Sequence, residues 1–139
     1  MIHLARQYFQ AVAFEQGFRK HYDGFATDNI PGTTFDRTFH VEAFNFQGRV
    51  LGQYSLEVRT PCVVRLFFKG FRDVDQAIET ATRAGEIYYR SCLEADRKLG
   101  AEIKNVFMDQ MVVEPYAVSN DNYVVCRIEF TVLFIKAVC

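Results

Sequence analysis

The fold is decided by the stretch Asn122-Tyr-Val-Val-Cys-Arg-Ile-Glu-Phe-Thr-Val-Leu-Phe-Ile-Lys-Ala-Val138, which has the clearest period in the chain. Its even positions are all apolar: Val124, Cys126, Ile128, Phe130, Val132 and Phe134. The odd positions Arg127, Glu129 and Thr131 are polar, so the alternation predicts a strand with one face on a core. From Leu133 and Ile135 onward the odd positions are apolar too. The second half of the strand is therefore expected to need a cover on both faces, from its own chain or from another subunit.

Three more strands are predicted before this one. The first two are expected at residues 35 to 44 and 56 to 68, where apolar and polar residues alternate, and the third at residues 103 to 116, where the pattern is mixed. The first should bulge or end near Ala43 and Phe44, because the alternation changes phase there. The second contains Pro61, which cannot donate to a ladder and is expected at an edge, a bulge or a break between two shorter strands.

Two helices are predicted from apolar residues at three and four spacing. Residues 1 to 22 form the first, and residues 73 to 99 form the second, with Asp73 as its cap and Gly100 as its stop. The order helix-strand-strand-helix-strand-strand predicts an α+β fold. We expect a mainly antiparallel four-stranded sheet, packed by one long helix plus an N-terminal helix, in a single domain covering residues 1 to 139.

The composition limits the classes of function. The chain has 139 residues, half of them apolar, and a formal net charge of −1, which argues against a protein whose main task is to grip nucleic acid. Its first residues lack the features of a secretory signal, and no apolar segment reaches the roughly twenty residues that span a bilayer. Synthesis in a cytoplasm without membrane insertion is the expectation.

No catalytic, cofactor-binding or metal-binding residue is predicted. His3, His21 and His40 are scattered, and the four cysteines are too widely spaced for a zinc site. Cys62 and Cys126 fall on inward faces of strands, where thiols are poor nucleophiles. In the pair Tyr88-Tyr89 we expect one ring to point inward and the other to lie at a surface. The sequence therefore predicts a protein that is not an enzyme.

The remaining signal is apolar residues in excess of what two helices can cover. They lie on the polar side of two strands and in the Phe-rich segment 35 to 46, and self-association is the simplest explanation for them. The predicted subunit-interface residues are Val63, Phe67, Leu133, Ile135, Phe44 and Phe46.

The order of elements resembles that of the tail terminator (tail completion) proteins of long-tailed bacteriophages. Three segments carry the resemblance: Pro61-Cys-Val-Val-Arg-Leu-Phe-Phe-Lys-Gly-Phe-Arg-Asp-Val-Asp-Gln-Ala77, Ile103-Lys-Asn-Val-Phe107 and the closing Val-Cys-Arg-Ile-Glu-Phe-Thr-Val-Leu-Phe. It extends over nearly the whole chain, but it concerns architecture more than invariant residues. The stretch from Gly24 to Gln53 departs from it.

The resemblance implies a subunit of a homohexameric ring in the virion, at the head-proximal end of the tail, assembled in the host cytoplasm. The ring would cap the tail tube protein, end its polymerisation, and meet a head-closure or neck protein on its other face. DNA would only pass through the lumen. The segments 23 to 34 and 45 to 53 are rich in turn formers and are expected to be loops that contact the tail or neck, with Asp28, Asn29, Gln47 and Arg49 as candidate contact residues.

Two other functions are compatible with the sequence. One is a ferredoxin-like small-molecule binding domain or enzyme that uses an aromatic pocket. The other is a different neck component or a tail-tube-like virion protein.

Overall fold

The structure is a computed structural model that describes residues 2–20, 37–44, 47–52, 55–69, 74–93, 103–118 and 121–137. The two helices of this part of the chain are α1 (Ile2–Glu15) and α2 (Val74–Cys92). The strands are β1 (Arg19–Lys20), β2 (Thr38–Ala43), β3 (Gln47–Gly52), β4 (Ser55–Lys69), β5 (Ile103–Val118) and β6 (Asp121–Ala137). The predicted α+β class and the order of the main elements are confirmed.

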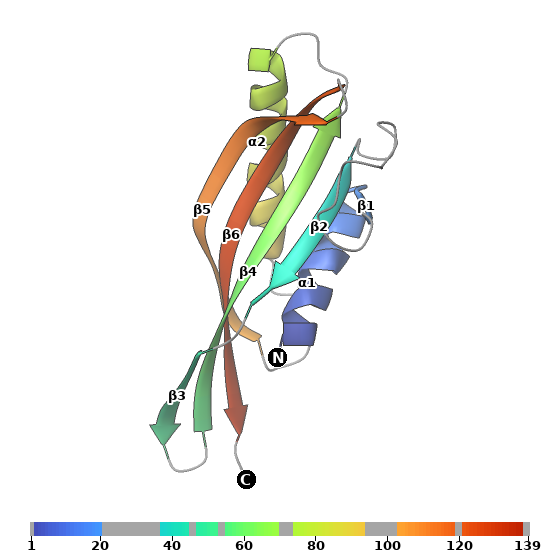
Figure 1. Cartoon of the computed structure of the whole chain (residues 1–139). Coiled ribbons are helices and arrows are strands. Elements are labelled where there is room, and N and C mark those ends of the chain that lie inside the picture. The colour runs from blue at the N-terminus through green and yellow to red at the C-terminus, as the bar shows by residue number, and fades with distance from the viewer. Residues whose placement is uncertain are drawn as a thin grey trace.

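The strands form one sheet in the order β1-β2-β4-β6-β5, and β3 pairs with the first part of β4 (Figure 1). All pairs are antiparallel except the short β1–β2 pair. β6 pairs with β4 along one edge and with β5 along the other. The strand with the clearest alternation is therefore a central strand.

The alternation in β6 has the predicted effect on burial. Its even positions from Val124 to Phe134 are all buried in one core, whereas Arg127, Glu129, Thr131 and Leu133 are only partly buried. β4 alternates in the same phase, so Cys62, Val64, Leu66 and Phe68 join this core. One face of the sheet is thus continuous and apolar, as a strand with period two requires.

The first helix ends earlier than predicted, at Glu15 instead of residue 22. Gly17 has a positive φ of 86°, a left-handed conformation that glycine adopts at little cost. The N–H of Phe18 donates to the carbonyl of Ala13 at 3.0 Å, and the N–H of Gly17 donates to that of Phe14 at 3.1 Å. These two bonds form a Schellman motif, which satisfies carbonyls at the helix end and turns the chain into β1.

The prediction that residues 45 to 53 form a loop is wrong for most of that segment. Residues 47–52 form β3, which pairs with β4 from Gln47 opposite Arg59 to Gly52 opposite Ser55. The two glycines of the segment suggested a turn, but a neighbouring strand that offers a full ladder outweighs weak local propensity.

Pro61 lies inside β4 and leaves the strand continuous. β3 pairs with β4 as far as Arg59, and β2 pairs with it from Cys62, so Pro61 stands where β4 changes partner on that edge. Its carbonyl accepts the N–H of Phe44 at 2.9 Å. In an antiparallel ladder the N–H and C=O of one residue point to the same side, so the missing N–H of Pro61 faces the gap between β3 and β2. The predicted break of this strand into two shorter strands does not occur; instead, the neighbouring strand changes from β3 to β2 at Pro61.

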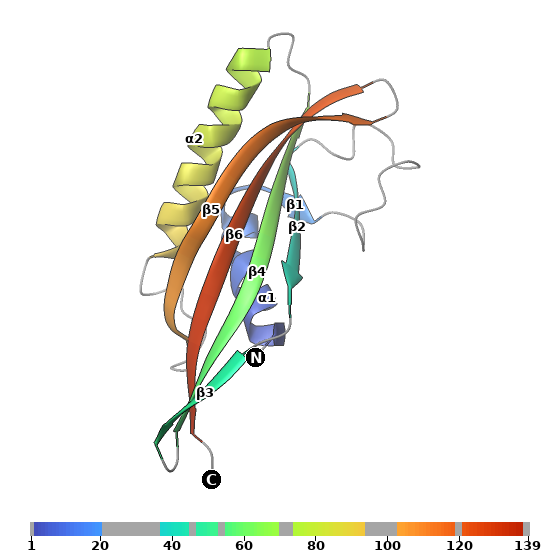
Figure 2. The same ribbon diagram turned by 60° about the vertical axis from the view of Figure 1, so that its left-hand side comes forward.

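Both helices cover the same face of the sheet (Figures 1 and 2). α1 buries Ala5, Tyr8, Phe9, Val12 and Ala13, which recur at three and four spacing. Phe14 was expected in the buried stripe, but its side chain is 54% exposed. It lies over the beginning of β2, where its ring meets that of Phe39 edge-on at 5.1 Å.

α2 runs alongside β5 and β6 (Figure 2) and buries Ala77, Ala81, Tyr88 and Cys92. Ile87 was expected in this stripe but is exposed. A Cβ built on Gly85 would lie 2.7 Å from the sulfur atoms of both Cys126 and Met111. The helix therefore approaches the sheet at Gly85 more closely than any other residue would permit.

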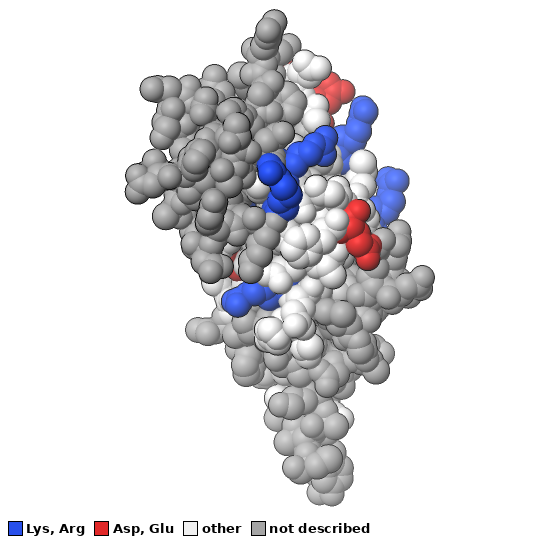
Figure 3. Space-filling view, turned by 90° about the vertical axis from the view of Figure 1, so that its right-hand side faces the viewer, with Lys and Arg blue, Asp and Glu red and all other residues white. Residues whose placement is uncertain are grey.

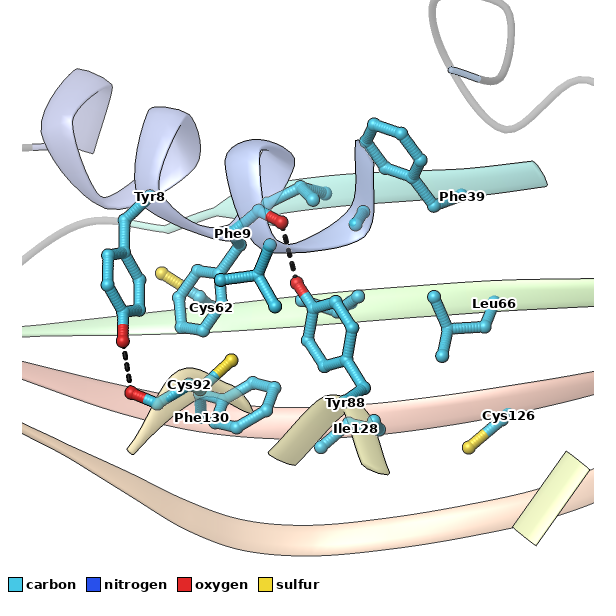
Figure 4. Close-up of a cluster of buried hydrophobic side chains, with 14 of the residues drawn as sticks. Tyr8, Phe9, Phe39, Cys62, Leu66, Tyr88, Cys92, Cys126, Ile128 and Phe130 are labelled. Carbon is cyan, nitrogen blue, oxygen red and sulfur yellow. Dashed lines mark hydrogen bonds between the residues drawn. The ribbon is translucent and has the colours of Figure 1, made fainter. Parts of the chain in front are cut away.

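A pair of buried tyrosines links the two helices (Figure 4). The hydroxyl of Tyr88 donates to the carbonyl of Phe9 at 2.7 Å, and the hydroxyl of Tyr8 donates to the carbonyl of Cys92. A third bond runs from Gln16 Nε2 to Ser91 Oγ at 2.8 Å. Phe130 of β6 lies beneath the crossing, with its ring 4.7 Å from that of Phe9 and 6.2 Å from that of Tyr88. These contacts fix both helices on the sheet. Neither of the two described helices lies on its other face, here called the open face.

Candidate functional site

Two of the predicted interface residues are buried within the single chain. Phe67 is fully buried and Val63 is 8% exposed, and both lie on the open face of β4. Val125, opposite Phe67 on β6, is also buried there, and all three are outside the core beneath the helices. The expectation that Phe67 and Val63 present exposed apolar surface is therefore wrong. A residue that its own subunit already buries adds little area to a contact with another subunit.

Charged side chains lie between these buried positions. Arg65 donates to Glu42 at 2.9 Å, and His40 lies 3.6 Å from the same carboxylate, so β2 and β4 are linked across the open face. Arg127 stands opposite Arg65 on β6, and its Nε is buried without a hydrogen-bond partner in the described part of the chain. In this charged cluster, Glu42 thus faces both Arg65 and His40.

Further along the open face, apolar side chains are exposed where the strands leave the helices. Phe44 is 44% exposed and Phe107 is 46% exposed. Pro61, Thr131 and Phe107 align across β4, β6 and β5, and Phe44 is bonded to Pro61 through its backbone. We call these four residues, together with the partly buried Leu133, the open-face row. Two predicted interface residues, Phe44 and Leu133, belong to this row.

The side chains of the other predicted contact residues are not described. Phe46, Asp28 and Asn29 lie outside the described residues. Ile135 is in β6, and Gln47 and Arg49 are in β3, but only the backbone of these three is described.

A groove between α2 and β5 was not predicted from the sequence. It has a volume of about 310 Å³ and is lined by Glu86, Tyr89, Arg90, Leu93, Met108 and Met111. Leu93 and Met108 are exposed large apolar residues, and Tyr89 stacks on Phe130 at 6.1 Å. Tyr88 is buried and Tyr89 only partly, so the expected division of the two rings is confirmed. The sequence signal for this groove was the mixed pattern of residues 106 to 111, because a strand beside a helix at the edge of a sheet can expose apolar side chains on both of its faces.

β5 forms one edge of the described sheet, and its pattern is interrupted twice. Register shifts fall between Ile103 and Asn105 and between Met108 and Gln110, where Asp109 is the extra residue. Asp109 accepts a hydrogen bond from the Thr131 hydroxyl at 2.6 Å. Bulges of this kind bend an edge strand and limit its pairing with other strands. Contacts on this side therefore depend on side chains more than on strand addition.

The described thiols are chemically inert, as predicted for Cys62 and Cys126. Both are buried and unpaired, and burial raises the pKa of each to about 12, with a smaller opposing effect of Arg6 on Cys62. Burial also raises the pKa of Cys92 far above its usual range. A thiolate is needed for nucleophilic attack, so these three residues are not candidates for covalent catalysis.

Within the described part of the chain, no group of three His, Cys, Asp or Glu residues could hold a metal ion. Neither of the two described helices is both long and apolar enough to cross a bilayer. Comparison of the chain with protein-family models finds no match, and comparison with curated proteins finds none either. The open-face row and the α2–β5 groove are therefore the candidate functional surfaces, and both are suited to binding.

Proposed function

We propose that this protein is a structural virion subunit that forms a homohexameric ring on the end of a bacteriophage tail tube. The ring stops polymerisation of the tube protein and joins the tail to a head-closure or neck protein, while DNA passes through its pore. The observation that carries the proposal is the exposure of large apolar side chains on separate sides of one subunit: Phe14, Phe44, Ile87, Leu93, Phe107 and Met108. Apolar surface distributed in this way suits a subunit with several neighbours.

Two further observations support a role in binding rather than catalysis. The described thiols are inert, and in the charged cluster of the open face Arg65 pairs with Glu42 of the neighbouring strand. A net charge of −1 also suits a pore through which DNA must slide without being held, because tight DNA binding depends on many Lys and Arg contacts with phosphates.

The long strands give the subunit a part that projects beyond its helices. β3, the first part of β4 and the end of β6 form a ribbon that extends away from both helices in Figures 1 and 2. A projecting ribbon offers surface to a second ring or to the tube. We assign the tube or neck contact to this ribbon, which contains the predicted contact residues Gln47 and Arg49.

The proposal is tested with purified protein and phage tail tube protein. Negative-stain images should show rings with a central hole, and light scattering should give a mass about six times the 16.1 kDa of one chain. Added to growing tubes, the protein should bind tube ends and limit tube length. Compact particles of one or two chains, together with unchanged tube growth, would contradict the proposal.

A second candidate is a small-molecule binding domain, which the α2–β5 groove favours. Its volume of about 310 Å³ is at the lower end of the range for ligand pockets, and its lining combines apolar side chains with Glu86 and Arg90. A thermal-shift screen of small amphiphilic compounds distinguishes this function from the first. Stabilisation that Met108→Glu abolishes would favour it.

A further inference from the structure

Two sides of the subunit differ in charge. On the side formed by α1, β1 and β2, the exposed described arginines are Arg6, Arg19 and Arg37, and Glu15 is the exposed described carboxylate. Figure 3 shows this side, where Lys and Arg side chains, together with some Asp and Glu side chains, lie around uncharged surface. We call it the basic side.

The side formed by α2 and β5 has the opposite excess. Its exposed described carboxylates are Asp75, Glu79, Glu86, Asp109 and Glu114, and its exposed described guanidinium groups are Arg83 and Arg90. Arg83 lies 3.7 Å from Glu79, so part of its charge is already balanced within α2. We call this the acidic side. The two sides lie at opposite ends of the sheet order, β1 and β2 at one end and β5 at the other (Figure 1).

The two sides also differ in shape. On the basic side, Phe14 lies at the C-terminal end of α1 and is 54% exposed. Its contact with Phe39 places it beside β1 and β2, where the N–H of Arg19 donates to the carbonyl of Arg37 at 2.8 Å. On the acidic side, the α2–β5 groove lies between Glu86 and Met108. The basic side thus has an aromatic projection, and the acidic side has an apolar groove whose lining includes Glu86 and Arg90.

We propose that the basic side of one copy of this chain docks on the acidic side of the next, with Phe14 entering the α2–β5 groove. A second copy is the occupant because the same molecule supplies both the projection and a groove of complementary charge. Since the two surfaces differ and face opposite ways, each copy contacts two neighbours head to tail. Such contacts close into a ring when the rotation between copies permits it and otherwise continue as a filament. The inference rests on the self-association within the proposed function and assigns the surfaces that make it.

The test uses two charge-reversed variants of the full chain. Arg6→Glu/Arg37→Glu makes both sides acidic, and Glu86→Lys/Glu114→Lys makes both sides basic. Each variant alone should have a subunit Kd more than tenfold weaker than the wild type in low salt, because like charges then face each other. An equimolar mixture should assemble again with alternating variants, since each acidic side meets a basic one. Added salt should weaken wild-type assembly, because it screens charges beyond about 8 Å at physiological ionic strength.

Two controls keep the result specific. Arg59→Glu changes net charge by half as much at an exposed position outside both the basic and the acidic side, and its assembly should match the wild type. Phe14→Ser removes the aromatic projection and should weaken assembly. Because it changes no charge, mixing this variant with either charge-reversed variant should not restore assembly. Thermal midpoints show that every variant is folded. Arg37 has a positive φ of 52°, which Arg and Glu both adopt reluctantly, so this substitution mainly tests charge.

The outcomes separate this inference from the proposed function. Assembly of each reversed variant at wild-type strength, or a wild-type particle of only two chains, overturns the head-to-tail contact. Rings that persist in both reversed variants and still cap tubes overturn the contact alone. Head-to-tail filaments restored by mixing, without any effect on tubes, support the contact and contradict the proposed function.

Discussion

The two buried tyrosine hydroxyls differ in what their removal leaves behind. Tyr88 donates to the carbonyl of Phe9, which lies inside α1 and keeps its helical partner. Tyr8 donates to the carbonyl of Cys92, the last residue of α2, where the helix itself supplies no donor. We expect Tyr88→Phe to cost about 0.5–1.5 kcal/mol, and Tyr8→Phe, which leaves a buried acceptor unsatisfied, to cost about 1–3 kcal/mol. Urea unfolding of both variants measures the difference, and a larger cost for Tyr88→Phe would contradict this account.

Phe67 and Leu133 were predicted from sequence to act alike, but the structure separates them. Phe67 is fully buried, so Phe67→Ala should destabilise the subunit by about 3–5 kcal/mol, and Phe67→Asp should unfold it instead of releasing intact monomers. Leu133 is only partly buried and stands opposite the exposed Arg59, so Leu133→Asp should fold normally. Leu133 lies on β6, outside the basic and acidic sides, so under the head-to-tail contact proposed above this variant should still assemble. Circular dichroism and light scattering on the two Asp variants check both expectations.

Burial on the core face was predictable at single residues, whereas burial on the open face was not. Alternation identified Cys126, Ile128 and Phe130 correctly because one face of a strand meets one core. The same rule placed Phe67 and Arg65 together on a polar face. On that face, however, Phe67 is buried whereas Arg65 is only partly buried. The burial of Phe67 depends on residues distant in sequence, and no local pattern contains that information.

Among the elements, α2 depends on close approach to the sheet at one residue. Gly85→Ala improves intrinsic helix propensity by about 1 kcal/mol, but the new methyl group would lie 2.7 Å from the Cys126 and Met111 sulfur atoms. Cys126 sits on the central strand and has little room to move. We therefore expect net destabilisation of about 1–3 kcal/mol, as for other overpacked cores. Gln76→Ala on the exposed face of the same helix is the matched control, and chemical denaturation that shows Gly85→Ala to be stabilising would refute the close packing.

The long elements were predictable, and the short ones were not. β4, β6 and α2 each have many residues in one period, so a few exceptions did not hide them. β1 has only two residues, and β3 contains two glycines and pairs with part of β4. Their existence depends on a partner strand being in place, and sequence alone does not show which partner that is. The α2–β5 groove was missed for the same reason, since it forms only when two separate elements meet.

For the whole molecule, the buried thiols predict loss of stability in alkali. An unfolded Cys ionises near pH 9, whereas burial raises the pKa of Cys62 and Cys126 to about 12 in the folded state. Above pH 9 the unfolded state loses protons that the folded state keeps, so the free energy of unfolding falls as pH rises towards 12. Each such thiol contributes a loss of about 1.4 kcal/mol per pH unit in this window. Urea midpoints at pH 7, 9 and 10.5 measure the slope, and Cys126→Ala should make it shallower; an equally steep slope in that variant would exclude this cause.

The central position of β6 also determines when the subunit can fold. β6 is the last of the described strands to leave the ribosome, yet it supplies pairing partners to both β4 and β5 and carries Phe130 beneath the two helices. Until it emerges, β4 and β5 have no common partner, and the apolar faces of α1 and α2 have no complete sheet to cover. Completion of the core therefore waits for the synthesis of β6, as expected when the contacts that close a core are distant in sequence. A chain that stops before residue 121 lacks the strand that joins β5 to β4, so it cannot form the complete sheet and is excluded from any assembly that recognises the folded subunit.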